Sequence, residues 1–120
     1  MPDRPVVVVT DETRLRTEIS DGMPKGFSAH VSEDARGALE TMRSITPAVI
    51  VVDIRTGSAG GVALARDMSQ DRRLAGVPIL MLLERPQDEW LARTAGARLV
   101  RTRSVSVEVL ARDIRDLASS

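Results

Sequence analysis

The stretch PAVIVVD, residues 47–53, decides the fold. Its apolar residues 48–52 form an unbroken run rich in β-branched side chains, and an aspartate follows directly. A run of this kind indicates a strand buried on both faces, as in a parallel sheet covered by helices. Two similar runs, VVVV at 6–9 and VPILMLL at 77–83, predict two more buried strands.

Two further segments, 27–31 and 98–102, have β-branched or apolar character with more polar residues, which is typical of strands at the edges of a sheet. Between the five strands, apolar side chains recur at spacings of three and four residues and predict amphipathic helices. The expected boundaries are a stop at Gly22, an N-cap at Ser32, a stop at Pro47, a start at Gly60 or Gly61, a first position at Pro86 and an N-cap at Ser106.

Strand and helix therefore alternate five times. This alternation predicts an α/β fold in which one doubly wound parallel sheet carries helices on both faces through right-handed crossovers. The strand order expected for such a flavodoxin-like (βα)₅ unit is 2-1-3-4-5. We expect residues 1–120 to form one domain, since the length suits a single core.

Composition excludes several classes of function. The chain has no cysteine and one histidine, which argues against a disulfide scaffold and a zinc centre. The 17 basic and 17 acidic residues balance, so binding of nucleic acid by bulk attraction is not expected unless an output domain follows. The apolar runs are too short to span a bilayer and no signal-peptide pattern opens the chain. We expect a cytoplasmic protein without a membrane partner.

Acidic residues gather where ligands bind in this type of sheet. That place is the crevice beyond the carboxyl ends of the first and third strands. Asp11 and Glu12 follow the first strand, and Asp53 ends the third. Carboxylates held close together repel unless a hard cation offsets their charge, and Mg²⁺ prefers such oxygen ligands. The alternative is that these residues are solvated or cap helices.

Four segments together resemble the receiver domain of bacterial response regulators, the CheY-like family, over essentially the whole chain. They are VVVVTDETRLR (6–16), PAVIVVDIRTGSAGG (47–61), GVPILMLLE (76–84) and AGARLVRTRSV (95–105). The family has an acidic pair after strand one, a phospho-accepting aspartate after strand three, a threonine or serine after strand four and Lys-Pro after strand five. It takes a phosphoryl group from a histidine kinase with bound Mg²⁺.

The resemblance implies a role for each matching position. Asp53 falls on the phospho-acceptor and Asp11 on the acid that binds the metal directly. Arg55 falls where the family offers a backbone carbonyl to the metal, and Glu12 is a further candidate ligand. Arg103 stands in the lysine position. A register one residue later would instead make Asp11 and Glu12 the acidic pair.

Other positions depart from the family, so the resemblance is to an atypical member. The replacements are Thr10 for the first acid, Leu83 for the hydroxyl residue, Val100 for the switch aromatic, Ser104 for the proline of Lys-Pro and Gly57 for a proline after the acceptor. Leucine cannot bond a phosphoryl oxygen, and arginine is a planar fork where lysine is a point charge.

Two versions of a signalling role follow, neither of them an enzyme acting on a separate substrate. Either Asp53 accepts phosphate from a histidine kinase or small phosphodonor, or a degenerate receiver binds its partner without phosphorylation. The resemblance implies a protein partner or a homodimer through the face of helix four, strand five and helix five, where Trp90 is a candidate anchor. Arg93, Arg98, Arg101 and Arg103 form either a docking patch or a solvated edge nearby.

Two other functions remain open. The segment TGSAGG, residues 56–61, opens a helix and could hold a flavin or nucleotide in a flavodoxin-like protein. The chain could also be an interaction domain from a longer protein.

Overall fold

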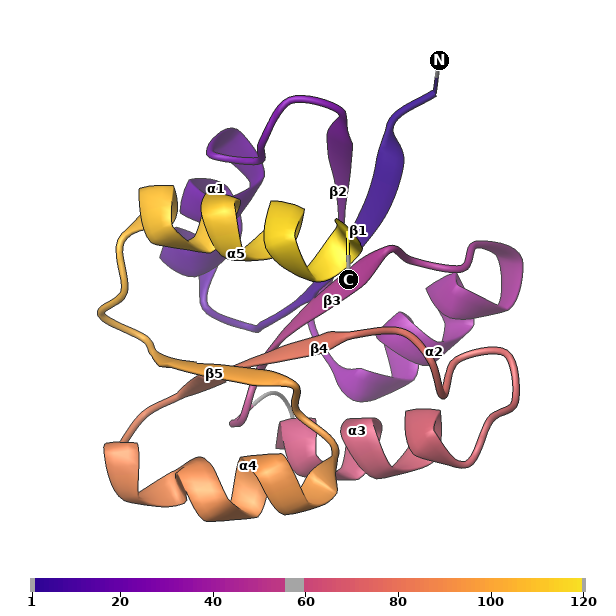
Figure 1. The fold of residues 1–120 in the computed structure, drawn as a ribbon, viewed down its shortest axis with the longest axis vertical. Coiled ribbons are helices and arrows are strands. Elements are labelled where there is room, and N and C mark those ends of the chain that lie inside the picture. The colour runs from indigo at the N-terminus through magenta and orange to yellow at the C-terminus, as the bar shows by residue number, and fades with distance from the viewer. Residues whose placement is uncertain (1, 56–59, 120) are drawn as a thin grey trace.

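Five parallel strands form one sheet in the computed structural model, which describes residues 2–55 and 60–119 (Figure 1). The strands are β1 (Arg4–Val9), β2 (Phe27–Ser32), β3 (Val49–Asp53), β4 (Ile79–Leu83) and β5 (Leu99–Thr102). Their order across the sheet is β2-β1-β3-β4-β5. The predicted fold class and strand order are confirmed, and the two polar strands, β2 and β5, lie at the edges as expected.

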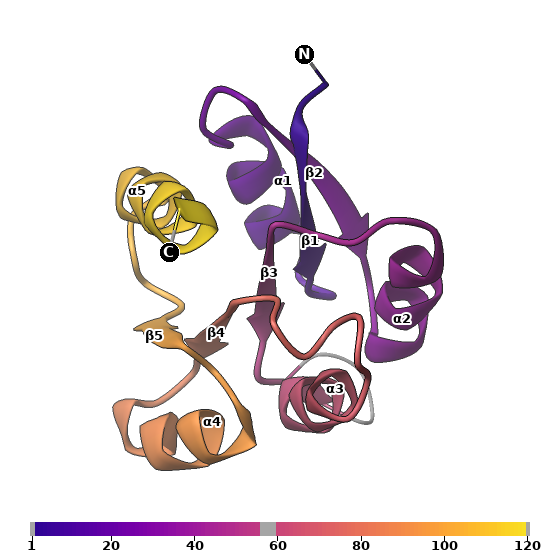
Figure 2. The same ribbon diagram turned by 45° about the vertical axis from the view of Figure 1, so that its right-hand side comes forward.

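Helices cover both faces of this sheet (Figure 2). They are α1 (Thr13–Asp21), α2 (Ala35–Ser44), α3 (Gly60–Ser69), the 3₁₀ turn η1 (Pro86–Asp88), α4 (Glu89–Ala95) and α5 (Val107–Ser119). One core lies between the sheet and α1 with α5, and the other between the sheet and α2, α3 and α4. Alternate residues of β1, β3 and β4 contribute to the two cores, which explains why those strands are apolar throughout.

The pairing of β1 with β3 positions the site. Val6 to Val9 lie opposite Val49 to Val52 in parallel register. The residues that follow Val9 and the residue that ends β3, Asp53, therefore emerge at the same edge of the sheet. This edge holds the carboxyl ends of the strands, where the sequence predicted the site.

The predicted stop of α1 at Gly22 and the start of α3 at Gly60 are confirmed, and two other helix boundaries need correction. Ser32 belongs to β2, and Asp34 caps α2, its carboxylate accepting a hydrogen bond of 2.8 Å from the main-chain nitrogen of Gly37. Pro86 opens the 3₁₀ turn before α4 rather than α4 itself. Ser106 caps α5 as predicted, since its hydroxyl accepts from the nitrogen of Val109 at 3.2 Å.

Most large apolar side chains are buried, and three in the described ranges are exceptions. Trp90 is 75% exposed on α4, with Leu91 beside it in the chain at 38%, and Val31 is 42% exposed on β2. Trp90 is thus no part of the core, which leaves the alternative of a surface role. No helix in the described residues is both long and apolar enough to cross a membrane.

Candidate functional site

Asp53 lies at the centre of the predicted crevice and is 2% exposed. Its Oδ1 accepts a hydrogen bond of 3.0 Å from the main-chain nitrogen of Arg55. Its Oδ2 accepts one of 3.3 Å from the hydroxyl of Thr10 and lies 3.3 Å from Nη2 of Arg103. A buried carboxylate needs such donors, because desolvation penalises its charge. Both oxygens of Asp53 are therefore engaged by the protein itself.

Thr10 joins two parts of the site. It is buried directly after β1, and its hydroxyl oxygen also accepts a hydrogen bond of 3.2 Å from the main-chain nitrogen of Glu12. One hydroxyl thus connects the acidic loop after β1 to Asp53 at the end of β3. The sequence reading treated Thr10 only as a missing acid and overlooked this role.

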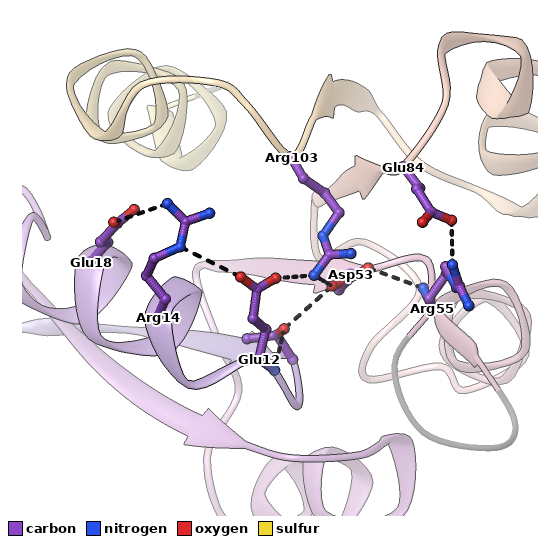
Figure 3. Close-up of polar contacts among 8 residues, drawn as sticks. Glu12, Arg14, Glu18, Asp53, Arg55, Glu84 and Arg103 are labelled. Carbon is purple, nitrogen blue, oxygen red and sulfur yellow. Dashed lines mark hydrogen bonds and ion pairs between the residues drawn. The ribbon is translucent and has the colours of Figure 1, made fainter.

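Arg103 reaches Asp53 and Glu12 with the same nitrogen, Nη2 (Figure 3). Its main-chain nitrogen donates 2.9 Å to the carbonyl oxygen of Leu83, which fixes the residue just beyond β5. Oε1 of Glu12 in turn lies 3.6 Å from Nε of Arg14. Nη1 of Arg14 lies 3.7 Å from Oε1 of Glu18. The result is an alternating chain of acidic and basic side chains that begins at Asp53.

Arg55 contributes its main-chain N–H to Asp53, while its side chain points to Glu84 (Figure 3). The hydrogen bond and the negative charge of Glu84 raise the pKa of the Arg55 guanidinium, with smaller contributions from Asp53 and Asp11. The carbonyl role implied for Arg55 by the resemblance stays a prediction.

Asp11 is exposed, in contrast to Glu12, which is half-buried. No hydrogen bond or ion pair to the Asp11 carboxylate occurs among residues 2–55 and 60–119. Of the two acids after β1, the structure brings Glu12 to the arginine at the site and leaves Asp11 facing solvent.

The arrangement also bears on whether a divalent cation fits. Within the described part of the chain, no three His, Cys, Asp or Glu side chains form a group that could hold a metal ion. Two predicted ligands, Asp53 and Glu12, already share the cation of Arg103. The residues as arranged therefore do not fit Mg²⁺. The predicted ligand roles of Asp11, Glu12, Asp53 and Arg55 stay predictions.

An open cavity of about 380 Å³ lies beside this network. It is lined by Glu12, Arg14, Glu84, Thr102, Arg103 and Ser104. Asp53 is not part of the lining, so Arg103 and Glu12 separate the buried carboxylate from this opening. Leu83, at the position of the family's hydroxyl, is 2% exposed and offers no donor.

The other arginines near β5 are also partnered. Arg93 donates 2.8 Å to Glu89, and Arg101 forms two hydrogen bonds of 2.8 and 3.0 Å with Asp113 of α5. This edge is therefore not a patch of free positive charge. The pair of Arg101 and Asp113 was missed from the sequence. Their spacing of 12 residues crosses from a strand to a helix and follows no local pattern.

Four residues of the predicted flavin or nucleotide loop, 56–59, lie outside the described residues, and with them Gly57. Only Gly60 and Gly61 are described, at the start of α3.

Solved structures of response regulators have the same fold. The chemotaxis response regulator CheY4 of Vibrio cholerae superposes with a TM-score of 0.88 at 20% identity, over 96% of this chain and 98% of that one. The signal receiver domain of a histidine kinase from Syntrophus aciditrophicus gives 0.83 at 22% identity, over 97% and 90%. The phosphorylated cyanobacterial phytochrome response regulator RcpA gives 0.79 at 14%, over 96% and 91%. This chain has the CheY-like receiver fold, and the resemblance is confirmed.

Sequence comparison gives a more distant relative. The sensor histidine kinase TmoS of Ectopseudomonas mendocina is 27% identical over 88 residues, which are 72% of this chain and 9% of that protein. The chain thus spans less than a tenth of the kinase's length. No protein-family model matches the chain. The matched proteins are thus named as response regulators, a receiver domain of a histidine kinase and a sensor histidine kinase.

Proposed function

We propose that this chain is a receiver module of a two-component pathway that binds a partner protein while Asp53 stays unphosphorylated. In this role it is a binding module in the cytoplasm rather than an enzyme. The receiver fold and the likeness to a histidine kinase support the pathway. The state of the Asp53 carboxylate supports the second half of the proposal.

The observation that carries the proposal is the engagement of Asp53 by three donors. A nucleophilic carboxylate must present an oxygen to the phosphodonor, yet Oδ2 of Asp53 is held by Thr10 and Arg103 and the residue is 2% exposed. Leu83 supplies no hydrogen bond to a phosphoryl oxygen. Each lost bond to a charged group costs about 1.5–3 kcal/mol. Both effects disfavour a phosphorylated state.

The test uses acetyl phosphate with MgCl₂ and the intact mass of the protein. We expect no increase of about 80 Da, the mass of one phosphoryl group, on the wild-type chain. The matched variant combines Leu83→Thr with Arg103→Lys and restores the family's residues. This variant should gain the adduct, and adding Asp53→Asn to it should abolish the gain. An adduct on the wild type that Asp53→Asn removes would contradict the proposal.

The partner surface we propose is the face of α4, β5 and α5. Trp90 is the most exposed large apolar side chain of the described residues and belongs to α4. Exposed aromatic residues commonly anchor protein interfaces. The bidentate bond between Arg101 and Asp113 fixes β5 to α5, so this face needs no phosphorylation to hold its shape.

A second copy of this chain is the occupant that the charges favour. A two-fold interface must be complementary to itself. The exposed acidic and basic side chains of α4 and α5 balance, three against three: Glu89, Glu108 and Asp116 against Arg93, Arg112 and Arg115. A partner of strongly acidic or basic character would find no such match.

Sedimentation equilibrium tests the homodimer. We expect a concentration-dependent dimer for the wild type and a monomer for Trp90→Ala, whose exposed position makes unfolding by the substitution improbable. Val31→Ala is the matched control, because Val31 is exposed on β2 at the opposite edge of the sheet. A wild type that stays monomeric at its highest soluble concentration would overturn the homodimer and leave this face to a different protein.

A further inference from the structure

We propose that the guanidinium of Arg103 replaces the divalent cation of this site, so that the folded protein does not bind Mg²⁺ there. The inference concerns the resident counter-ion and is independent of the proposed function. Asp53 could prove phosphorylatable with the arginine in place, and a metal could bind without phosphorylation. The two are therefore tested by different measurements.

The first argument is position. Asp11, the acid that the resemblance assigns to the metal, is exposed, so a cation that bridges the loop after β1 and the end of β3 as arranged here would lie between Glu12 and Asp53. Nη2 of Arg103 lies there: it donates a hydrogen bond to Oε2 of Glu12 and is 3.3 Å from Oδ2 of Asp53 (Figure 3). The main-chain bond of 2.9 Å from Arg103 to Leu83 anchors the side chain's origin. A main-chain hydrogen bond thus fixes the position from which the Arg103 side chain reaches the two carboxylates.

The second argument is charge. The carboxylates of Asp53 and Glu12 carry two negative charges, and Arg103 and Arg14 bring two positive ones. Arg14 also pairs with Glu18, so the network as a whole holds three negative charges against two positive ones, and Arg103 is the cation that Asp53 and Glu12 share. A divalent ion entering it would meet the positive charge of Arg103. Mg²⁺ would have to expel the arginine before it could reach Asp53.

The third argument is the chemistry of arginine against lysine. A guanidinium is a planar, delocalised cation that is more weakly hydrated than an ammonium, so it is better suited to pairing with carboxylates away from water. Arg103 is only 28% exposed, and its Nε is buried without a hydrogen-bond partner among the described residues. A buried donor left unpaired is rare in native structures and calls for an explanation, which the pairing of this guanidinium with Asp53 and Glu12 supplies. The side chain of Arg103 is held in place by the carboxylates of Glu12 and Asp53.

The experiment measures thermal unfolding and metal binding without any phosphodonor. Wild type, Arg103→Met and the matched control Arg101→Met are each heated with MgCl₂ and with NaCl at equal ionic strength. Arg101→Met also removes an arginine from an ion pair, but its partner Asp113 lies on α5, away from Asp53. We expect Mg²⁺ and matched salt to act equally on wild type and on Arg101→Met.

Arg103→Met should unfold at a lower temperature than wild type, and Mg²⁺ should raise its midpoint by about 3–6 °C over matched salt, as a ligand of millimolar affinity would. Two results would overturn the proposal. One is an Arg103→Met protein as stable as wild type without metal, and the other is a destabilised one that Mg²⁺ does not restore.

A second measurement decides the matter if Arg103→Met does not fold. Mn²⁺ broadens the NMR signals of amides close to its binding site. With the wild-type protein, we expect the amides of residues 10–12 and 53–55 to keep their line widths at millimolar Mn²⁺. Selective broadening of those amides would show a metal at Asp53 and would contradict the proposal without the use of any variant.

Discussion

The hydroxyl of Thr10 donates a hydrogen bond of 3.3 Å to the carboxylate of Asp53, 43 positions away in the chain. Both residues are almost fully buried, Thr10 at 1% and Asp53 at 2% exposure. The resemblance to receiver domains implied a carboxylate where Thr10 stands. A neutral donor there removes one negative charge from the crevice and supplies a hydrogen bond to the remaining one. The site is thereby satisfied from within the protein.

Replacing Thr10 with valine should destabilise the fold by about 1–3 kcal/mol, because it leaves a buried carboxylate short of one donor. The side chain keeps its shape, so packing changes little. Urea denaturation measures the difference in unfolding free energy. Thr17→Val on the exposed side of α1 is the control and should change stability by less than about 0.5 kcal/mol. If the two substitutions changed the unfolding free energy equally, the hydrogen bond of Thr10 would contribute nothing to stability.

Gly61 at the start of α3 should tolerate no side chain. A Cβ there would lie 2.8 Å from the main-chain oxygen of Asp53 and 3.1 Å from Cα of Ile54. Gly61→Ala must shift the backbone beside the acceptor, and we expect a loss of about 1–3 kcal/mol. At Gly76 a Cβ would meet nothing within 4 Å. Gly76→Ala should be neutral or stabilising by about 0.4–1 kcal/mol. Thermal unfolding should show a clearly lower midpoint for Gly61→Ala, and a midpoint for Gly76→Ala equal to or above that of the wild type.

The ion pair of Arg101 and Asp113 should contribute to stability more than a surface pair does. Arg101→Met would leave the carboxylate of Asp113, 5% exposed, without its partner, which is 36% exposed. Allowing for that exposure, we expect a cost of about 1–3 kcal/mol. Arg112→Met, on an exposed position of the same helix, should cost less than about 0.5 kcal/mol.

The same pair makes a prediction about pH. The hydrogen bond to Asp113 raises the pKa of Arg101. A raised pKa on a basic group gives stability that is complete below the unfolded pKa and lost only as pH rises through the folded one. Both lie far above neutrality, so the stability difference between wild type and Arg101→Met should stay constant from about pH 6 to about pH 9. A steady loss of that difference over this range would contradict the assignment.

Asp34, and not Ser32, should carry the N-cap of α2. Asp34→Ala removes the hydrogen bond of 2.8 Å to Gly37 and should cost about 1 kcal/mol. Ser32→Ala should cost less, because Ser32 ends β2 and does not accept from the first turn of the helix. Chemical denaturation of both variants checks the order. A larger loss of stability for Ser32→Ala than for Asp34→Ala would support the N-cap at Ser32 that the sequence predicted.

The sequence by itself determined the sheet. Runs such as residues 48–52 and 77–83 are apolar without a break because central parallel strands are covered on both faces, and that pattern is local and readable. The strand order then fixed the edge at which Asp53 lies. The cap at Ser106 was also local, since the capping hydroxyl and the main-chain N–H of Val109 that donates to it are close in sequence.

Only the tertiary structure decided how the crevice is neutralised. The sequence named Asp53, Glu12 and Arg103 as site residues but could not tell that one nitrogen of Arg103 reaches both carboxylates. It favoured Asp11 over Glu12, whereas Glu12 meets the arginine and Asp11 faces solvent. The physical reason is range. Burial patterns repeat within a few residues, but a contact across 91 positions depends on the exact path of two loops beyond the strand ends.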